Sequence, residues 1–457
     1  MSRRWFGTDG VRGVANQRLT PELAFFIGQA AGVWLAGQGG HPRAVIGSDT
    51  RRSGPMLGAA VTAGLCSAGI DVNDVGVAPT PTVSFLARTG EFGLGVIVSA
   101  SHNPAPDNGV KFVGHDGRKL PDASEEEIEA RMERPFSRPT GGDVGGIERD
   151  RSGIESYLQF LQGLLPERLE GWHIAVDCAN GAAFELGPEI LRRLGAKLSL
   201  IGVQPDGVNI NSECGATKPE TVGKFTADVG AQIGVAFDGD ADRAVFCDEQ
   251  GRLINGDRTM GIWAAHRKRR GELNPPVTVG TVMSNGGFEA YLTAQGVKLE
   301  RAPVGDKYVA QRIEETKALV GGEQSGHIIF PQNGPTGDGL ATALELLRVL
   351  RVEGKKASEY LDAYEPWPQL LVNVGVESTE GWRDKVAEEL AESERMIGSL
   401  GRVVVRPSGT QPMIRVMVEA KEYDVRDKAA EAIVAAMEKR LNGHVHGRVD
   451  LTYALGD

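Results

Sequence analysis

Short apolar runs alternate with longer helical patterns along most of the chain, and one order of elements occurs three times. Each copy begins with an apolar strand that ends in a polar or glycine turn, followed by a helix that ends near a glycine. The three first turns lie within residues 44–54, 174–182 and 278–287. The three helix-end glycines are Gly69, Gly195 and Gly296. Helices between neighbouring strands predict largely parallel or mixed sheets that are covered on both faces.

Each copy also contains a later apolar strand that runs directly into a polar loop. LGVIV leads to SASHNP (99–104), IGVAF leads to DGDADR (238–243), and ALVG leads to GEQSGH (322–327). Ligands of open α/β sheets bind at the carboxyl ends of strands. We therefore expect these three loops to form the walls of one cleft between domains.

The C-terminal part of the chain has a different pattern. From about Trp367 onward, alternating strands precede an amphipathic helix at 425–441, which predicts a small α+β layer. A Pro/Gly-rich run at 134–146 separates the first copy from the second. At roughly 100–200 residues per domain, the length is enough for three or four domains. We predict three related α/β domains with mixed sheets and a smaller α+β domain, at 1–150, 151–255, 256–365 and 366–457.

Composition narrows the partners. The formal net charge of -11 argues against nucleic acid or an anionic membrane as partner of the whole molecule. The basic run HRKRR (266–270) is expected to be a solvated helix face, and the uncharged stretch Leu23 to Pro42 a core helix rather than a membrane span. Four widely spaced cysteines suggest neither a disulfide framework nor a zinc site. No secretory signal is visible at the N-terminus, so we expect a cytoplasmic protein.

The loop SASHNP contains a hydroxyl nucleophile, Ser101, followed by His102 and a turn-forming Asn-Pro pair. An isolated serine of this kind more often caps a turn. Downstream, Lys111 lies on the next predicted strand, where an ammonium could steady a phosphoryl group or move a proton. A catalytic role for Ser101 therefore depends on the other loops.

The loop DGDADR places three carboxylates at alternate positions, so that they can converge on one divalent cation. These residues are Asp238, Asp240 and Asp242. A calcium loop of the EF-hand type is the rival interpretation, but Arg243 stands where that loop needs glycine and the flanking segments are strands. Three carboxylates beside an arginine favour Mg²⁺ that also contacts a phosphate.

Two further segments suggest binding of a phosphorylated sugar. GEQSGH presents Glu323, Ser325 and His327, and a carboxylate can accept hydrogen bonds from two neighbouring sugar hydroxyls, although alone this segment is best explained as an ordinary polar loop. RPSGTQPMIR (406–415) concentrates hydrogen-bond donors without an acidic residue, which favours a phosphate site over a polar hairpin. Its candidate ligands are Arg406, Ser408, Gly409, Thr410 and Arg415. Arg12 adds a guanidinium in the glycine-rich N-terminal loop.

A nucleophile, a cation site, a ring-binding loop and a distal phosphate clamp are what a sugar-phosphate mutase needs. The motifs resemble the α-D-phosphohexomutases along nearly the whole chain. They are FGTDGVRG, SASHNP, VDCANGA, GVNINSECGAT, DGDADR, GTVMSN, GEQSGH and RPSGT. The resemblance implies four domains around a central cleft, with the phosphoserine, metal, sugar and phosphate loops in domains I to IV respectively.

The resemblance also implies a role for each candidate. Ser101 would be the phosphoserine, and the three aspartates would bind Mg²⁺ together with it. Arg12, His102 and Lys111 would support transfer and proton movement, and Arg243 would sit beside the metal loop. Glu323 and Ser325 would hold the sugar hydroxyls, and the 406–415 loop would bind the substrate phosphate.

Gln324 and the segment GVNINSECGAT resemble the branch that acts on glucosamine phosphates, whereas methionine at position 324 is more usual in enzymes of mannose and glucose phosphates. Gln411 departs from the glutamate usual in that branch. The implied reaction interconverts glucosamine 6-phosphate and glucosamine 1-phosphate through glucosamine 1,6-bisphosphate, on the route to UDP-N-acetylglucosamine and peptidoglycan. A mannose or glucose phosphate mutase and a non-catalytic sugar-phosphate binding protein are the alternatives, and a homodimer is left open.

Overall fold

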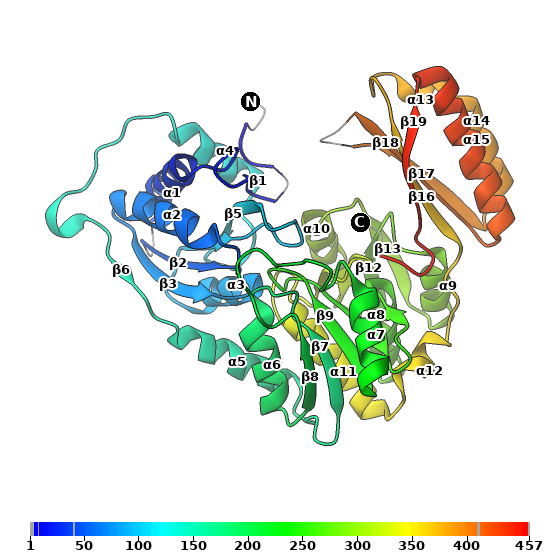
Figure 1. Ribbon diagram of the computed structural model, residues 1–457, viewed down its shortest axis with the longest axis horizontal. Helices are drawn as coiled ribbons and strands as arrows, with labels where there is room; N and C mark the ends of the chain where they lie inside the picture. Colours follow the sequence, from blue (N-terminus) through cyan, green and yellow to red (C-terminus); the bar gives the residue numbers. More distant parts are fainter. Residues whose placement is uncertain (1–3, 8, 40–41, 409–411, 456–457) are drawn as a thin grey trace.

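The computed structural model describes residues 4–7, 9–39, 42–408 and 412–455. They form four sheets, each the centre of one structural unit, numbered here I to IV in chain order. Units I and IV stand at opposite ends, with units II and III between them (Figure 1). Among the described residues, no helix is both long and apolar enough to span a membrane.

Unit I is built on a six-stranded mixed sheet in the order β1-β5-β4-β2-β3-β6. Neighbouring residues of its inner strands face opposite sides: Val45 packs in one hydrophobic cluster, and Ala44 and Ile46 pack in another. The sheet is therefore covered on both faces, as expected from its continuous apolar strands. Its elements are β1 (Val11–Val14), α1 (Pro21–Ala36), β2 (Arg43–Ser48), α2 (Gly54–Ser67), β3 (Asp71–Val77), α3 (Thr80–Thr89), β4 (Leu94–Val98), β5 (Asp107–Gly114), α4 (Asp122–Arg131), a short 3-10 turn (Gly141–Asp143) and β6 (Ile147–Glu148).

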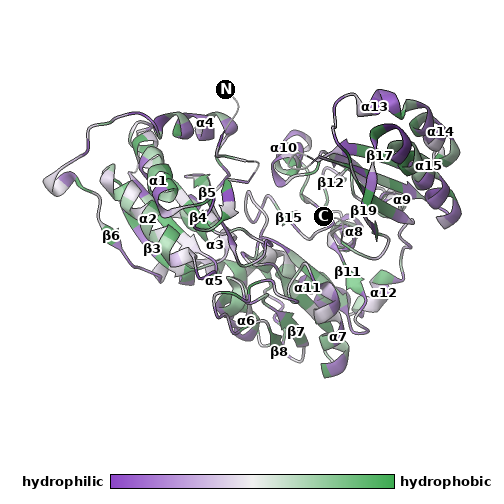
Figure 2. Cartoon of the chain, turned by 45° about the horizontal axis from the view of Figure 1, so that its top comes forward, coloured by the Kyte–Doolittle hydropathy of each residue, from purple (hydrophilic) through white to green (hydrophobic). Residues whose placement is uncertain are grey.

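Unit II has a five-stranded sheet in the order β11-β10-β9-β7-β8, in which β7 pairs in parallel with β8 and β9, and β10 runs antiparallel to β9. Its strands are among the most hydrophobic parts of the chain (Figure 2). Its elements are α5 (Ser152–Leu164), β7 (His173–Asp177), α6 (Ala183–Arg193), β8 (Lys197–Ile201), α7 (Pro219–Val229), β9 (Ile233–Phe237), β10 (Ala244–Asp248) and β11 (Leu253–Ile254).

Unit III has a four-stranded sheet in the order β13-β12-β14-β15. Three of its helices begin at a side chain that accepts a hydrogen bond from the first turn, namely Asn255, Asn285 and Asp338. Its elements are α8 (Gly256–Arg269), β12 (Val277–Thr281), α9 (Gly286–Ala294), β13 (Lys298–Ala302), α10 (Asp306–Thr316), β14 (Gly321–Gly322), β15 (Ile328–Ile329), α11 (Gly339–Glu353) and α12 (Ala357–Leu361).

Unit IV is an antiparallel four-stranded sheet in the order β17-β18-β16-β19, with its helices packed against it. This is the small α+β layer that the alternating strands predict. Its elements are β16 (Gln369–Gly375), α13 (Trp382–Lys385), α14 (Ala387–Ile397), β17 (Gly401–Pro407), β18 (Met413–Ala420), α15 (Tyr423–Leu441) and β19 (His444–Asp450).

The internal repeat is confirmed. Units I to III share one core order, β5-β4-β2-β3, β10-β9-β7-β8 and β15-β14-β12-β13, in which the first-named strand is antiparallel to its neighbour. The glycines that end the three helices all have positive φ, at 84° for Gly69, 93° for Gly195 and 70° for Gly296. Each of the three polar loops joins the strand that comes third along the chain (β4, β9 or β14) to the antiparallel strand beside it (β5, β10 or β15).

Unit IV is attached to the rest of the molecule at both of its ends. Where the chain enters, the Gln369 side chain donates from Nε2 to Met283 O of unit III (2.9 Å). The Gln369 carbonyl accepts from Leu451 N (2.7 Å), which ties the two ends of unit IV to each other. Leu451 also packs with Met283 of unit III. Beyond β19 the chain returns to the middle of the molecule (Figure 1), where Leu455 packs on a hydrophobic cluster of unit II.

Candidate active site

Ser101 lies in the loop between β4 and β5 and is only 3% exposed. Its backbone has φ of 52°, a left-handed conformation that costs energy for a residue with a side chain. Its hydroxyl donates to Asp238 Oδ2 at 2.7 Å, and its oxygen lies 3.3 Å from His102 Nδ1. The nucleophile loop of unit I therefore meets the aspartate loop of unit II, as the sequence predicts.

The aspartate loop follows β9, and its three carboxylates come together. One oxygen from each of Asp238, Asp240 and Asp242 lies within 4.8 Å of the others. Burial, together with repulsion from the other two, raises the pKa of Asp238 well above its ordinary value. Asp240 Oδ1 and Asp242 Oδ1 are buried and accept no hydrogen bond from the described residues. Buried carboxylate oxygens left without donors fit a bound divalent cation.

A glycine allows the two loops to approach. A Cβ on Gly239 would lie 2.4 Å from the carbonyl oxygen of Ser101, which is far inside van der Waals contact. On the other side of the loop, Thr80 holds Asp240 with its hydroxyl (2.6 Å to Oδ2) and its backbone N–H (2.9 Å to the carbonyl). Thr80 belongs to unit I, so the position of this carboxylate is set across the boundary between units.

Lys111 lies on β5 as predicted and is buried beside the aspartates. Its Nζ is 3.0 Å from Asp240 Oδ2 and 3.5 Å from Asp9 Oδ2. Burial alone would lower the pKa of Lys111, but attraction to Asp240 and Asp9 outweighs it and keeps the pKa above its ordinary value. Arg12, on β1, also pairs with Asp9. Lys111 and Arg12 are therefore two cations held beside the aspartates by one carboxylate, Asp9, from the N-terminal loop.

The sugar-loop candidates of unit III lie in two different surroundings. Glu323 Oε1 accepts a hydrogen bond from Gly305 N (2.8 Å), and Ser325 is 3% exposed. His327 instead packs against the aspartate loop, with Nδ1 3.6 Å from Asp242 Oδ2. Burial opposes the imidazolium, but attraction to Asp242 raises the pKa of His327 to about 9. This histidine is thus placed to orient the Asp242 carboxylate.

Arg243 follows the aspartates directly. Its backbone N–H lies 3.2 Å from Asp238 Oδ1, and its backbone pairs with His327 in an isolated antiparallel bridge. The loops of units II and III are therefore joined by backbone as well as by charge. With the contact between Ser101 and Asp238, the structure brings three of the four predicted loops together.

The phosphate-clamp candidates lie in unit IV, where β17 and β18 end. Arg406 and Arg415 are direct cross-strand partners, and Ser408 N donates to Met413 O at 2.8 Å. Burial first and Arg415 second lower the pKa of Arg406, while Glu323 of unit III opposes the shift. The attraction between Arg406 and Glu323 links the phosphate-clamp candidates of unit IV to the sugar loop of unit III. Gly409 and Thr410 lie outside the described residues.

Sequence reasoning assigned no role to several residues that hold these loops. They are Asp9, Asp49, Arg51, Thr80 and Asn211. Asp49 and Arg51 lie in the first turn of unit I, and Asn211 lies in GVNINSECGAT, so each was within a recognised segment. For Asp49 the available signal was a charged residue directly after a strand with an apolar centre, because such residues lie at the carboxyl edge of the sheet.

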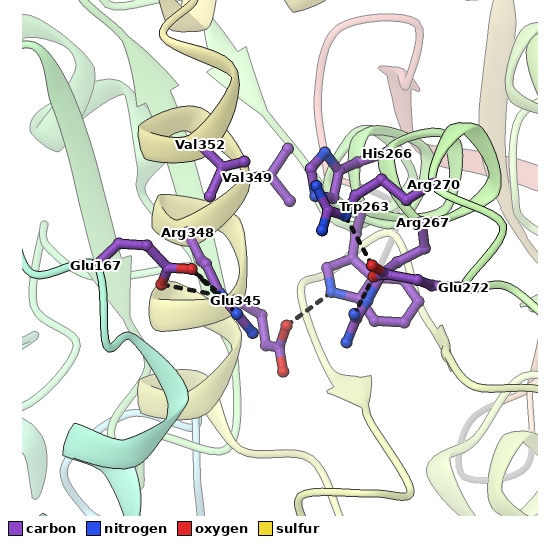
Figure 3. A pocket seen from close by; sticks show the side chains of 10 residues that line it. All are labelled: Glu167, Trp263, His266, Arg267, Arg270, Glu272, Glu345, Arg348, Val349 and Val352. Atoms are coloured by element: carbon purple, nitrogen blue, oxygen red, sulfur yellow. Dashed lines mark hydrogen bonds and ion pairs between the residues drawn. The ribbon is translucent and has the colours of Figure 1, made fainter.

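A cavity of about 160 Å³ lies away from these loops, between α8 and α11 (Figure 3). Its charges satisfy one another: Arg348 pairs with Glu167, and Arg267 pairs with Glu272. The basic run 266–270 forms one side of it, and its first residue, His266, is buried against Glu353 (2.7 Å) rather than solvated. The run is therefore a solvated face only from Arg267 onward, because His266 is buried.

Comparison with known proteins accounts for all four units. Family models described as phosphoglucomutase/phosphomannomutase alpha/beta/alpha domains I, II and III match residues 3–138, 155–251 and 255–367. The model of the C-terminal domain of the same family matches residues 371–436.

Curated relatives and solved structures point to the same family as the domain models. Phosphoglucosamine mutase of Shouchella clausii is 45% identical over 442 residues, covering 96% of this chain and 99% of the relative. That of Desulforamulus reducens is 45% identical, with 94% and 98% covered. A phosphoglucomutase/phosphomannomutase family protein of Burkholderia thailandensis has a similar structure, with a TM-score of 0.82, 25% identity, and 96% and 98% of the chains covered. Parafusin, a phosphoglucomutase from Paramecium in its open form, shares the fold at a TM-score of 0.78, 16% identity and 98% coverage of both chains. The chain therefore belongs to the phosphoglucosamine mutase branch of the α-D-phosphohexomutases.

Proposed function

We propose that this protein interconverts glucosamine 6-phosphate and glucosamine 1-phosphate, with Ser101 as the residue that carries the phosphoryl group between turnovers. The observation that carries the proposal is the Ser101 hydroxyl, which lies 2.7 Å from one of three convergent carboxylates in a protein nearly half identical to phosphoglucosamine mutases. The reaction would serve the bacterial cytoplasmic route to UDP-N-acetylglucosamine and peptidoglycan.

In the proposed cycle, phosphorylated Ser101 donates its phosphoryl group to the free hydroxyl of a bound monophosphate. The bond from phosphorus to Ser101 Oγ breaks as the bond to the sugar oxygen forms. The proton of the sugar hydroxyl passes in net to Ser101 Oγ, with His102 as the proposed carrier. The product of this step is glucosamine 1,6-bisphosphate. After the bisphosphate turns around, its other phosphoryl group returns to Ser101, which leaves the isomeric monophosphate.

Mg²⁺ is the proposed metal, held by Asp238, Asp240 and Asp242 together with the Ser101 oxygen. When bound, it would offset the charge of the phosphoryl oxygens during transfer. The orphaned carboxylate oxygens of the triad support this assignment. Magnesium suits the site because it favours a few carboxylates and completes its shell with phosphate oxygens.

The basic residues around the triad have two proposed tasks, which are stabilisation of the phosphoryl charge and exchange of a proton. Lys111, whose pKa is held above its ordinary value, keeps its ammonium and stabilises phosphoryl oxygens rather than accepting a proton. Arg12 assists from β1, and Arg243 does so beside the metal loop. His102 is placed to exchange a proton, because its Nδ1 lies 3.3 Å from Ser101 Oγ.

Units III and IV would bind the rest of the substrate. Glu323 would accept hydrogen bonds from the sugar hydroxyls, and Ser325 would donate to or accept from them. His327 would support this loop from the side of the aspartates. The distal phosphate would be bound by the clamp of unit IV. Its proposed ligands are Arg406, Ser408, Gly409, Thr410 and Arg415. The domain limits proposed for these tasks are 1–150, 151–255, 256–365 and 366–457.

Replacement of Ser101 by alanine tests the proposal. S101A should lose turnover of glucosamine phosphates but retain their binding, and intact mass should show that the phosphate of the parent protein is absent. Normal turnover by S101A would refute the role of this serine. A coupled assay with a panel of sugar phosphates tests the substrate, and much faster turnover of mannose or glucose phosphates would overturn the glucosamine assignment.

A further inference from the structure

The backbone that carries Ser101 is held by one buried arginine. Arg51, from the first turn of unit I, is 1% exposed, and its guanidinium donates to carbonyl oxygens throughout the nucleophile loop. Nη2 lies 2.9 Å from Ser101 O and 2.7 Å from Asn103 O. Nη1 donates to Asp107 O at 3.0 Å and also to Pro104 O. Four carbonyls of one loop therefore converge on one planar cation.

Two of these carbonyls have a second donor, from another unit. Asn211 Nδ2 lies 2.9 Å from Ser101 O and 3.2 Å from Asn103 O. A carbonyl oxygen can accept two hydrogen bonds, so both donors fit. Asn211 follows β8 of unit II, and its own backbone has φ of 58° and a hydrogen bond to Ala179 O. The loop is thus held from unit I and from unit II at the same two atoms.

Arg51 is itself fixed in place. Its Nε and its backbone N–H both donate to Asp49, at 2.9 Å each. Asp49 also accepts from the Ser99 hydroxyl at 2.5 Å, and Ser99 Oγ accepts from Ser101 N at 2.9 Å. Hydrogen bonds therefore run from the arginine through the carboxylate to the amide of the nucleophile. A buried charged network of this kind is rigid when all its members are satisfied.

We propose that Arg51 and Asn211 form a carbonyl clamp that holds Ser101 in its left-handed conformation, with its hydroxyl directed at the aspartate triad. Neither side chain contacts Ser101 Oγ, so both are positioning residues. The clamp opposes relaxation of Ser101 to negative φ, which would move its oxygen away from Asp238. The inference rests on the proposed transfer through Ser101 and adds the groups that orient it.

The kinetic test uses R51K and N211A, with R52K as the matched control, because Arg52 is the exposed neighbour of Arg51. Lysine keeps the charge but cannot span four carbonyls. We expect kcat for glucosamine 6-phosphate to fall about 100-fold in R51K, the loss typical of a displacement of about 1 Å. We expect a fall of about 10-fold in N211A, which loses two of the six hydrogen bonds, and KM within about threefold of the parent in both. If the two residues had a purely structural role, we would not expect kcat to fall while KM stays nearly unchanged.

A second measurement does not depend on turnover. Amide exchange at residues 101–107 should be faster in R51K and in N211A than in R52K, whereas exchange in β4 should be unchanged. If R51K does not fold, N211A decides, since it removes only two hydrogen bonds from a part-buried side chain. Unchanged exchange in the folded variants, or kcat within about twofold of the parent, would overturn the clamp. If the parent protein failed to turn over glucosamine phosphates while the exchange result held, the substrate assignment would fail and the clamp would stand.

Discussion

Arg406 and Arg415 face each other as directly paired residues of β17 and β18. Like charges in this arrangement destabilise a sheet, and part of Arg406 is also buried. Such a pair is favourable once a dianion lies between the two guanidiniums. The relationship therefore supports the anion site proposed for unit IV.

Replacing Arg415 by glutamine should weaken substrate binding more than it slows the reaction. We expect KM for the sugar phosphate to rise about 10-fold to 100-fold, since a charge-assisted hydrogen bond contributes about 1.5 to 3 kcal/mol. The melting temperature without ligand should not fall, because repulsion is relieved. R448Q, an exposed change in the same unit, is the control. A KM equal to that of R448Q would show that the phosphate binds elsewhere.

Replacing Asp238 by asparagine should raise the stability of the metal-free protein and remove its response to magnesium. Burial first, and repulsion from Asp242 and Asp240 second, raise the pKa of Asp238, so its charge is unfavourable without a cation. We expect Mg²⁺ to increase the melting temperature of the parent but not of D238N, with turnover at least about 100-fold lower. D228N, an exposed change on α7, should behave as the parent does. Equal magnesium responses in D238N and D228N would exclude the triad as the metal site.

The stability of the protein should depend on pH through Asp338. Burial raises its pKa to about 6, although it accepts hydrogen bonds from Ala341 N (2.9 Å) and from the Tyr157 hydroxyl. A carboxyl whose pKa is higher in the folded state stabilises the fold when protonated, and this contribution is lost as the pH rises through about 6. Because water reaches part of the side chain, we expect a loss of about 1 to 2 kcal/mol.

The variant D338N isolates this effect, because asparagine can still begin α11. Its free energy of unfolding should exceed that of the parent at pH 8, and the difference should shrink toward pH 5. Denaturant unfolding at both pH values measures it, with D228N for comparison. A difference that did not change with pH would exclude Asp338 as the titrating group.

Gln324 should support the contact between units III and IV rather than set the choice of sugar. It is 2% exposed, and its Nε2 lies 3.4 Å from Gln369 Oε1 at the entry to unit IV. We expect Q324M to lower kcat/KM for glucosamine and glucose phosphates by the same factor, about 3-fold to 10-fold for one lost hydrogen bond. The ratio of kcat/KM for the two sugars is the measurement. A ratio that moved toward glucose phosphate would instead make Gln324 a specificity residue.

The repeat and the catalytic loops could be predicted from the sequence because their signals are periodic or concentrated. Apolar strands of similar length precede Ser101 and Asp238, and the acidic residues alternate. The partners of these residues have no such signal. Arg51 is buried by four carbonyls that come from a loop about 50 residues away, and nothing in its local sequence distinguishes it from exposed Arg52. His327 was recognised as a polar loop residue, but only the fold places it against Asp242.

The two attachments of unit IV restrict how it can move. Unit IV joins unit III through more than one strand of its sheet: Gln369 of β16 donates to Met283 O, and Glu419 of β18 accepts from Gly286 N, both at 2.9 Å. Leu455 adds a contact with unit II. A body held along an edge and at a second place cannot swivel freely. The end of the β17–β18 hairpin would therefore keep facing the same part of the molecule.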